Sequence, residues 1–349
     1  MGYSFCVCKN HEVRERTENM KVIDMHCDTI SELFYRREGG KEYSLLKNDC
    51  HIDLERMKKG DYYLQNFALF TELPRHERPF EYCMKLVDLF YTEMEKNQDL
   101  IGVVTSYKDI EENRLAGRMS AMLTIEEGGV CQGELAFLRN FYRLGVRMMT
   151  LTWNHKNELA YPNRIWQEHD EVFFEPDMEH GLTEKGIEFL KEMEHLGIIV
   201  DISHLSDAGI EDVFRYTTKP FVASHSNARM VASNPRNLTD DMIRRLSERG
   251  GVAGLNYCAA FLHDWKKGEG AISRVEDMIA HIKHMKQVGG IECIGLGSDF
   301  DGIGGDLEMK SPEDLPVLEA AMKNSGFTER EIEAVFYKNV LRVYKEILH

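Results

Sequence analysis

Long apolar runs are missing from this 349-residue sequence, in which no stretch approaches the roughly 20 residues that a membrane-spanning helix needs. The first 20 residues carry charges throughout and contain no hydrophobic signal segment. The sequence therefore gives no sign of a membrane span or of secretion, and we expect a cytoplasmic protein.

Positive charge is scarce relative to negative charge. Lys and Arg together number 43 against 59 Asp and Glu, which gives a formal net charge of -16 at pH 7. A surface of this sign repels nucleic acid phosphates and anionic lipid headgroups. We therefore expect neither nucleic acid nor a membrane as a partner.

Cysteine is present, but the spacing of the cysteines indicates no disulfide framework and no metal site. The eight cysteines are scattered along the chain, and thiols of a cytoplasmic protein usually stay reduced. Cys6 and Cys8 form a Cys-x-Cys pair without a second pair at metal-ligand spacing, so we assign them no role. Because the opening residues are polar and aperiodic, we expect residues 1–19 to be a disordered extension and residues 20–349 to form a single domain.

Short apolar segments alternate with longer amphipathic ones. One of the latter has Thr183 as a candidate N-cap and Gly197 as its stop, and the closing helix opens with the capping-box spacing of Thr328 and Glu331. Eight segments are expected to be strands: 22–28, 62–70, 120–127, 146–153, 197–204, 220–226, 251–257 and 293–300. This alternation of strands and helices predicts an α/β fold, a TIM-like (β/α)8 barrel, rather than an open doubly wound sheet.

Polar side chains stand at the ends of five of these segments, and the ends of parallel barrel strands meet at one mouth. The side chains are His26 and Asp28, Glu126, His204, His225 and Asp299. Three imidazoles with several carboxylates suit Zn²⁺ or a similar ion, and the set exceeds the three protein ligands typical of one catalytic zinc. We therefore expect two metal ions.

Each of these residues also has an ordinary explanation. A histidine can be hydrogen-bonded at a strand terminus, Asp28 can cap a helix, and Glu126 and Glu127 can be solvated loop charges. The segment "DFDG" can be a simple turn. All of these explanations would have to coincide at the same end of different strands, so the joint pattern favours the metal site.

A set of motifs makes the pattern recognisable. In order along the chain they are "IDMHCD", "TIEEGG", "LGVRMMTLTWN", "VDISHLSD", "ASHSNAR", "NPRNL" and "GLGSDFDG". From about Met20 to the C-terminus the sequence resembles the membrane dipeptidase (renal dipeptidase) family of zinc peptidases, in its soluble bacterial form. The resemblance implies two zinc ions in a TIM-like barrel and hydrolysis of dipeptides, including those with a C-terminal D-residue.

The resemblance also implies roles for individual residues. His26 and Asp28 hold one zinc, His204 and His225 hold the other, and Glu126 bridges the pair. Asp299 is the general acid and base, and Arg236 receives the C-terminal carboxylate of the dipeptide. Many family members have a substrate-contacting histidine at the position of Trp153; here either His155 replaces it or that role is missing, and we take His155 as the candidate.

Such a site would hydrolyse its substrate through a metal-bridging hydroxide, with Asp299 moving the proton. Ser203 and Ser224 would point away from the metals as packing or supporting residues. Two alternatives stay open: another binuclear barrel hydrolase, such as a deaminase or lactonase, and a metal-binding protein without turnover. The expected partners are dipeptide substrates, and a homodimer is the assembly that we consider.

Overall fold

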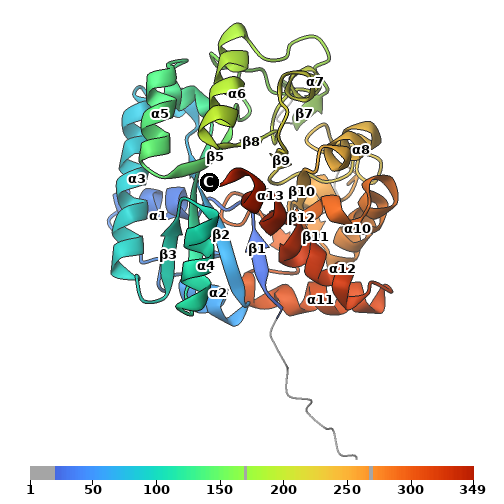
Figure 1. Cartoon of the computed structure of the whole chain (residues 1–349). Helices are drawn as coiled ribbons and strands as arrows, with labels where there is room; N and C mark the ends of the chain where they lie inside the picture. The colour runs from blue at the N-terminus through green and yellow to red at the C-terminus, as the bar shows by residue number, and fades with distance from the viewer. Residues whose placement is uncertain (1–19, 169–170, 267–269) are drawn as a thin grey trace, which may run out of the picture.

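The computed structural model describes residues 20–168, 171–266 and 270–349 (Figure 1). The expected N-terminal extension, residues 1–19, lies outside the described residues. In the described part of the chain, no helix combines the length and the apolar character that a bilayer crossing requires.

Eight parallel strands close into a ring, because β1 pairs with both β2 and β12, and β2 also pairs with β4. In ring order the strands are β1 (Val22–Asp24), β2 (Tyr62–Phe70), β4 (Met119–Glu126), β5 (Val146–Thr150), β8 (Ile199–Asp201), β9 (Val222–Ala223), β10 (Val252–Leu255) and β12 (Ile294–Leu296). Each strand lies in one of the expected segments or extends it by a single residue. The predicted TIM-like barrel is confirmed.

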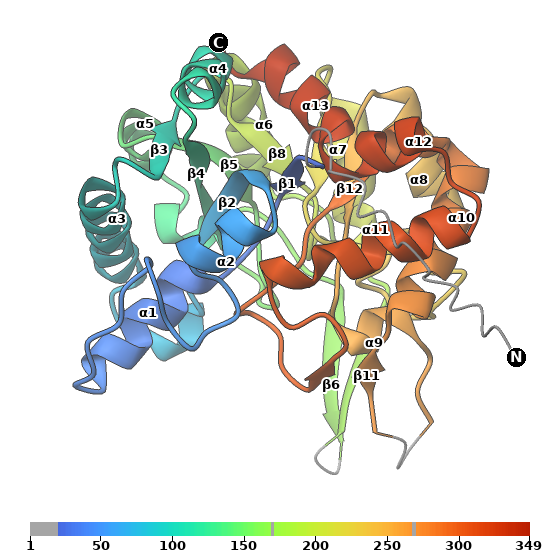
Figure 2. The ribbon, with the colours of Figure 1, turned by 90° about the horizontal axis from the view of Figure 1, so that it is seen from below.

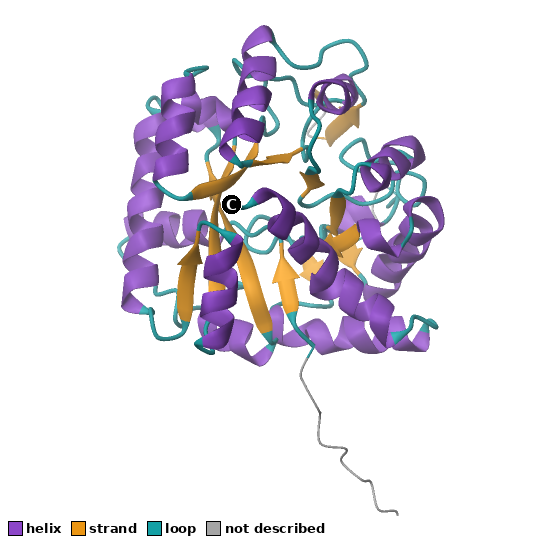
Figure 3. Ribbon diagram, viewed as in Figure 1, coloured by secondary structure: helices purple, strands orange, loops and turns teal. Residues whose placement is uncertain are grey.

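Helices surround this barrel (Figures 1 and 3). They are α1 (Thr29–Glu38), α2 (Leu54–Lys59), α3 (Pro79–Lys96), α4 (Tyr107–Leu115), α5 (Leu135–Arg143), α6 (Glu184–Leu196), α7 (Asp207–Tyr216), α8 (Asp240–Glu248), α9 (Ala259–Leu262), α10 (Val275–Gly289), α11 (Leu315–Asn324), α12 (Glu329–Glu333) and α13 (Asn339–Ile347). Local signals set their ends as expected. Thr183 Oγ1 accepts from the Gly186 N–H at 3.1 Å, Gly197 ends α6 with φ of 81°, and the capping box of Thr328 and Glu331 is formed.

The last helix closes one end of the barrel. Val340, Val343 and Tyr344 of α13 are fully buried with strand residues such as Ile23 and Leu64. Each such side chain contributes roughly 1.5–3 kcal/mol of hydrophobic stabilisation. The opposite end of the ring, where the strands finish, is thereby left for the loops that carry polar residues.

Several smaller elements were not expected from the sequence. Strand β3 (Ile101–Val104) pairs with the first half of β4 outside the ring. Strands β6 (Arg164–Glu168) and β7 (Glu171–Glu175) form an antiparallel hairpin, and β11 (Ile272–Ser273) pairs with β13 (Asp306–Leu307). Figure 2 shows β6 and β11 on the side of the barrel opposite α13.

Candidate active site

The six expected side chains meet at the carboxyl ends of the strands. Glu126 is the last residue of β4, and the others follow β1, β8, β9 and β12 within four residues. All are buried, with at most 9% of their surface exposed: His26, Asp28, Glu126, His204, His225 and Asp299. The barrel topology therefore brings together residues that are far apart in the sequence.

His26 faces a group of carboxylates. Its Nε2 lies 3.3 Å from Glu126 Oε2, 3.5 Å from Asp28 Oδ2 and 3.8 Å from Asp299 Oδ1. Within the described part of the chain, His26 Nε2 and Asp28 Oδ1 are buried without a hydrogen-bond partner. Asp28 does stand at the N-cap position of α1, but its side chain makes no capping hydrogen bond. The Oδ1 atom of Asp28 can therefore take a further partner.

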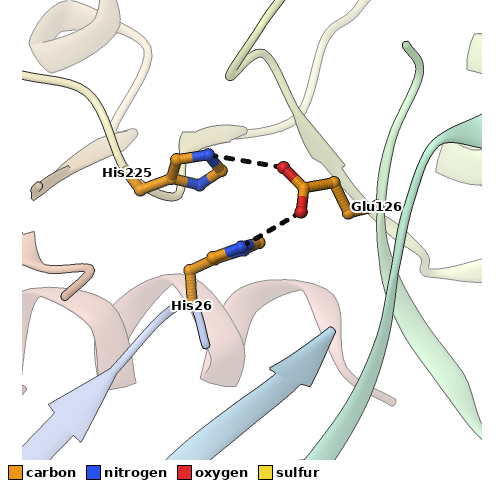
Figure 4. Close-up of side chains that lie close together, drawn as sticks. All are labelled: His26, Glu126 and His225. Atoms are coloured by element: carbon orange, nitrogen blue, oxygen red, sulfur yellow. Dashed lines mark ion pairs between the residues drawn. The ribbon is translucent and has the colours of Figure 1, made fainter. Parts of the chain in front are cut away.

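His204 and His225 face the other oxygen of Glu126. His204 Nε2 lies 3.0 Å from Glu126 Oε1, His225 Nε2 lies 3.6 Å from the same oxygen, and the two Nε2 atoms are 2.9 Å apart. Figure 4 shows His26 and His225 directed at different oxygens of the Glu126 carboxylate. Glu126 is therefore shared between two sets of donor atoms.

The hydrogen bonds on the far side of each ring set the tautomer. Ser224 Oγ donates to Asp201 Oδ2 at 2.5 Å, so it accepts from Nδ1–H of His225 at 2.7 Å. His204 Nδ1 likewise lies 2.9 Å from the acceptor Asn154 Oδ1. Both Nε2 atoms then carry lone pairs that face each other and a carboxylate. This arrangement suits a cation, because only a positive charge satisfies all three atoms.

Electrostatics show that negative charge is concentrated around His26. Burial raises the pKa of Glu126 to about 8 and that of Asp299 to about 6, and the neighbouring charge of Asp28 acts on both in the same direction. Burial alone would lower the pKa of His26, but the charges of Glu126 and Asp28 raise it well above its ordinary value. Without metal, protons must neutralise this cluster. Imidazole nitrogens with carboxylate oxygens are donors that Zn²⁺ accepts.

Two buried aspartates that the sequence analysis did not assign hold the loops that carry the candidate metal ligands. Asp201 accepts from the N–H groups of Ser203 at 3.0 Å and Ser224 at 2.8 Å, and from Thr150 Oγ1 at 2.7 Å. Asp24 accepts from the N–H and Oγ of Ser298, at 2.9 and 2.6 Å. Asp24 stands two residues before His26, in "DMH", and Asp201 stands three residues before His204, in "DISH", so no common spacing marked them in the sequence. Ser203 and Ser224 both donate their N–H groups to Asp201, and their supporting role stays a prediction.

A cavity of about 690 Å³ opens onto these donors. Asp28, Glu126, His204 and Asp299 line its floor, and its walls include the aromatic rings of Phe70, Trp153 and Phe261. Asp299 also accepts from Asn256 Nδ2 at 2.9 Å, which fixes its carboxylate. A small polar molecule can therefore reach the donor sets while aromatic rings enclose its remainder.

Arg236 is not among the residues that line this cavity, but it packs against Phe261, which is. Its side chain is buried, and its guanidinium carbon lies 5.2 Å from the centre of the Phe261 ring. Among the described residues its guanidinium makes only two hydrogen bonds, each of 3.4 Å, to Ser226 Oγ and the His225 carbonyl, and its Nε finds no partner. Among the described residues no carboxylate lies within 4.0 Å of it. This buried cation lacks an anionic partner.

The loop after β5 places different residues at the cavity from the one that was expected. Trp153 and Asn154 line the cavity, whereas His155 is not among the lining residues. The His155 carbonyl accepts from Thr152 Oγ1 at 2.5 Å. Glu127, with 1% exposure, accepts from the N–H groups of Trp153 at 3.0 Å and Gly129 at 2.8 Å. Its explanation as a solvated loop charge was wrong, because it organises this loop.

Comparison with known proteins identifies the family to which the sequence is similar. Residues 10–349 match the family described as membrane dipeptidase (peptidase family M19). An uncharacterized dipeptidase of Schizosaccharomyces pombe is 31% identical over 361 residues, with 95% of this chain and 82% of that protein covered. Dipeptidase 3 of Mus musculus is 28% identical over 309 residues, with 84% of this chain and 57% of that protein covered.

Solved structures share the fold. The crystal structure of dipeptidase AC, a metallopeptidase of family M19, matches with a TM-score of 0.86 at 26% identity and covers 95% of this chain and 99% of that one. A metallopeptidase from Rhodobacter sphaeroides, liganded with a phosphinate mimic of the dipeptide L-Ala-D-Ala, matches with a TM-score of 0.85 at 24% identity, covering 95% and 100%.

The barrel and its buried donor sets define a metal-dependent hydrolase. The chain belongs to the membrane dipeptidase family, peptidase family M19, and its enzyme class is that of a metallo-dipeptidase. The expected family, fold and enzyme class are confirmed. The roles of the individual site residues stay predictions and are taken up below.

Proposed function

We propose that this chain hydrolyses dipeptides with two zinc ions, one held by His26 and Asp28 and the other by His204 and His225. The observation that carries the proposal is the division of the Glu126 carboxylate, whose Oε2 faces His26 at 3.3 Å and whose Oε1 faces His204 at 3.0 Å. When bound, the two cations would polarise the scissile carbonyl and lower the pKa of a water molecule. Side chains of the protein would perform the proton transfers and bind the substrate carboxylate.

Asp299 is the proposed proton carrier. It lines the cavity beside Asp28, and the bond from Asn256 directs one of its oxygens, leaving the other toward the donor sets. Near two cations its carboxylate stays ionised, so it can take a proton from the attacking water. It then returns that proton to the departing amine, a role often worth about 10² to 10⁴ in rate.

Arg236 is the proposed anchor of the substrate carboxylate. A guanidinium can grip a carboxylate with two parallel hydrogen bonds, and this one has no ion-pair partner among the described residues. A dipeptide has its carboxylate one residue beyond the scissile bond, so the anchor selects dipeptides over longer chains. A C-terminal D-residue is proposed as acceptable, a proposal supported by the family resemblance and the L-Ala-D-Ala mimic bound to the Rhodobacter protein.

The test combines metal analysis with a substrate screen. Gently purified protein should contain close to two zinc equivalents per chain, and Glu126→Ala should lose at least one. The zinc-loaded protein should hydrolyse members of a dipeptide library that includes C-terminal D-residues. Chelation should abolish turnover, and Zn²⁺, Mn²⁺ or Co²⁺ should restore it. Full zinc occupancy and full activity in Glu126→Ala would refute the shared-carboxylate assignment.

A different substrate class would appear in the same screen. A deaminase or lactonase does not need a free carboxylate at the Arg236 position. If dipeptides are inert while a lactone or an aminated ring is turned over, the proposed substrate is wrong and the metal assignment stands. If every substrate is inert while two zinc ions bind, the metal-binding protein without turnover is the remaining alternative.

A further inference from the structure

We propose that Asn154 serves both the metal centre and the substrate: its side-chain oxygen holds His204 in the metal-binding tautomer, and its side-chain NH₂ donates to an oxygen of the bound dipeptide. The inference rests on the proposed function, since it assigns a substrate contact to that same site. It replaces His155 as the candidate for the role that a histidine fills in many family members.

The first step is the orientation of His204. Its Nε2 faces Glu126 Oε1 at 3.0 Å and His225 Nε2 at 2.9 Å, so that nitrogen has to present a lone pair to a cation. The ring proton then resides on Nδ1, which lies 2.9 Å from Asn154 Oδ1. A metal-bound histidine generally donates its other N–H to such an acceptor, which fixes the tautomer and the ring plane.

The second step is the orientation of the amide itself. Because Oδ1 accepts from His204, Nδ2 is on the other side of the planar amide group and points away from that ring. The described residues supply no hydrogen-bond partner for this NH₂, although Asn154 lines the cavity together with Trp153 and His204. Because Asn154 lines the cavity, the two N–H donors of its amide are available to a molecule bound there. Their natural acceptor is a carbonyl oxygen, or the oxyanion into which it develops.

The third step is the rigidity of the loop. Glu127 accepts from the backbone N–H of Trp153 at 3.0 Å, immediately before Asn154, and also from Asn157 Nδ2. Asn157 Nδ2 donates as well to the Leu151 carbonyl at 2.8 Å, which ties both ends of the loop together. A donor held in this way is preorganised, so it aids the transition state without a cost of reorganisation.

Two substitutions separate the two roles. Asn154→Asp keeps an acceptor for His204 but removes the donors to the substrate. We expect its zinc affinity to stay within threefold of wild type and its kcat to fall by about 10²-fold, the usual loss for one oxyanion donor. KM should change less than threefold, and affinity for a phosphinate mimic of L-Ala-D-Ala should fall with kcat. Asn154→Leu removes both functions, so its zinc affinity should also fall by about 10- to 100-fold.

Matched variants control for charge and for position. Asn140→Asp makes the same change on the exposed face of α5, where it should alter neither zinc affinity nor kcat. Thermal midpoints of all variants, measured with zinc bound, check that each is folded. His155→Ala tests the competing assignment. If it lowers kcat more than Asn154→Asp does, the substrate contact belongs to His155 and the proposal is overturned.

The remaining outcomes are also decisive. Asn154→Leu with wild-type zinc affinity would overturn the tautomer role, and Asn154→Asp with wild-type kcat would overturn the donor role. If the wild-type protein hydrolyses no dipeptide, the proposed function fails and takes the donor role with it. The zinc titration of Asn154→Leu still decides the His204 role in that case, so the two failures are distinguishable.

Discussion

Replacing Arg236 by methionine is the sharpest test of substrate recognition. Methionine keeps most of the volume beside Phe261 and removes the charge. The guanidinium is buried, has an unpartnered Nε, and makes only two hydrogen bonds of 3.4 Å. The stability of the folded state therefore depends little on this charge. Because burial lowers the pKa of Arg236, the empty site bears a desolvation cost that a substrate carboxylate would offset.

The magnitude follows from Coulomb's law. Two unit charges about 4 Å apart interact by ~4 kcal/mol at an effective dielectric constant of about 20. Ordering the substrate and desolvating its carboxylate oppose this gain, so we expect a net loss of about 2 to 4 kcal/mol in Arg236→Met. Since each 1.36 kcal/mol is a factor of ten, kcat/KM should fall by roughly 30- to 1,000-fold. Arg236→Lys should recover little of this, because an ammonium lacks the planar fork.

The assay compares a good dipeptide with its C-terminal amide on wild-type and variant protein. The amide should be a poor substrate for wild type and should lose little more in Arg236→Met, because the group that Arg236 binds is already absent. Thermal stability of the zinc-loaded variant should not fall, since an unpaired buried charge has been removed. Equal cleavage of acid and amide by wild type would refute the anchor and favour a deaminase or lactonase.

Three further predictions concern the proton carrier, the supporting carboxylate and pH. Asp299→Asn should keep both zinc equivalents and lower kcat by roughly 10²-fold or more, whereas an active variant would mean that another base operates. Asp201→Ala leaves several buried donors without an acceptor, so urea titration should show a loss of at least about 3 kcal/mol, and an unchanged midpoint would contradict its supporting role. Buried His281 accepts from the Ala228 N–H at 3.1 Å and donates to the Leu262 carbonyl at 3.0 Å, and burial lowers its pKa to about 4. The unfolded chain takes up this proton near pH 6.5 and the folded chain does not, so stability should fall by about 2 kcal/mol between pH 7 and pH 5. His281→Gln should remove that part of the pH dependence, and an identical pH profile in the variant would exclude His281 as its source.

The barrel strands could be located from the sequence because each is a short apolar segment bounded by polar or turn-forming residues. Strand β3 was missed because Ile101–Val104 is short and pairs only with the first half of β4. The hairpin of β6 and β7 was missed because its charged residues interrupt the apolar pattern on which strand prediction depends.

The metal-ligand candidates were also accessible from the sequence. In a parallel barrel the strand ends converge whatever their spacing along the chain, so a polar residue at the end of an apolar segment is already placed at the mouth. Glu127 and Asp201 could not be assigned in this way. Their roles depend on N–H and hydroxyl groups from other segments, such as Trp153 and Thr150, which no local pattern reveals.

The sequence by itself determined the closed barrel and the six side chains at its mouth, because local apolar patterns locate the strands and their ends, and it determined the family through the motifs that it shares with it. Only the tertiary structure decided which atoms meet there. Asn154 and His204 are 50 residues apart, and so the bond that orients this imidazole is invisible in the linear chain. Asn154 lines the cavity, whereas His155, the next residue in the chain, does not. The loop conformation decides which of the two lines the cavity, and Glu127 holds that conformation by accepting from the Trp153 N–H. Long-range hydrogen bonds of this kind exist only in the folded molecule.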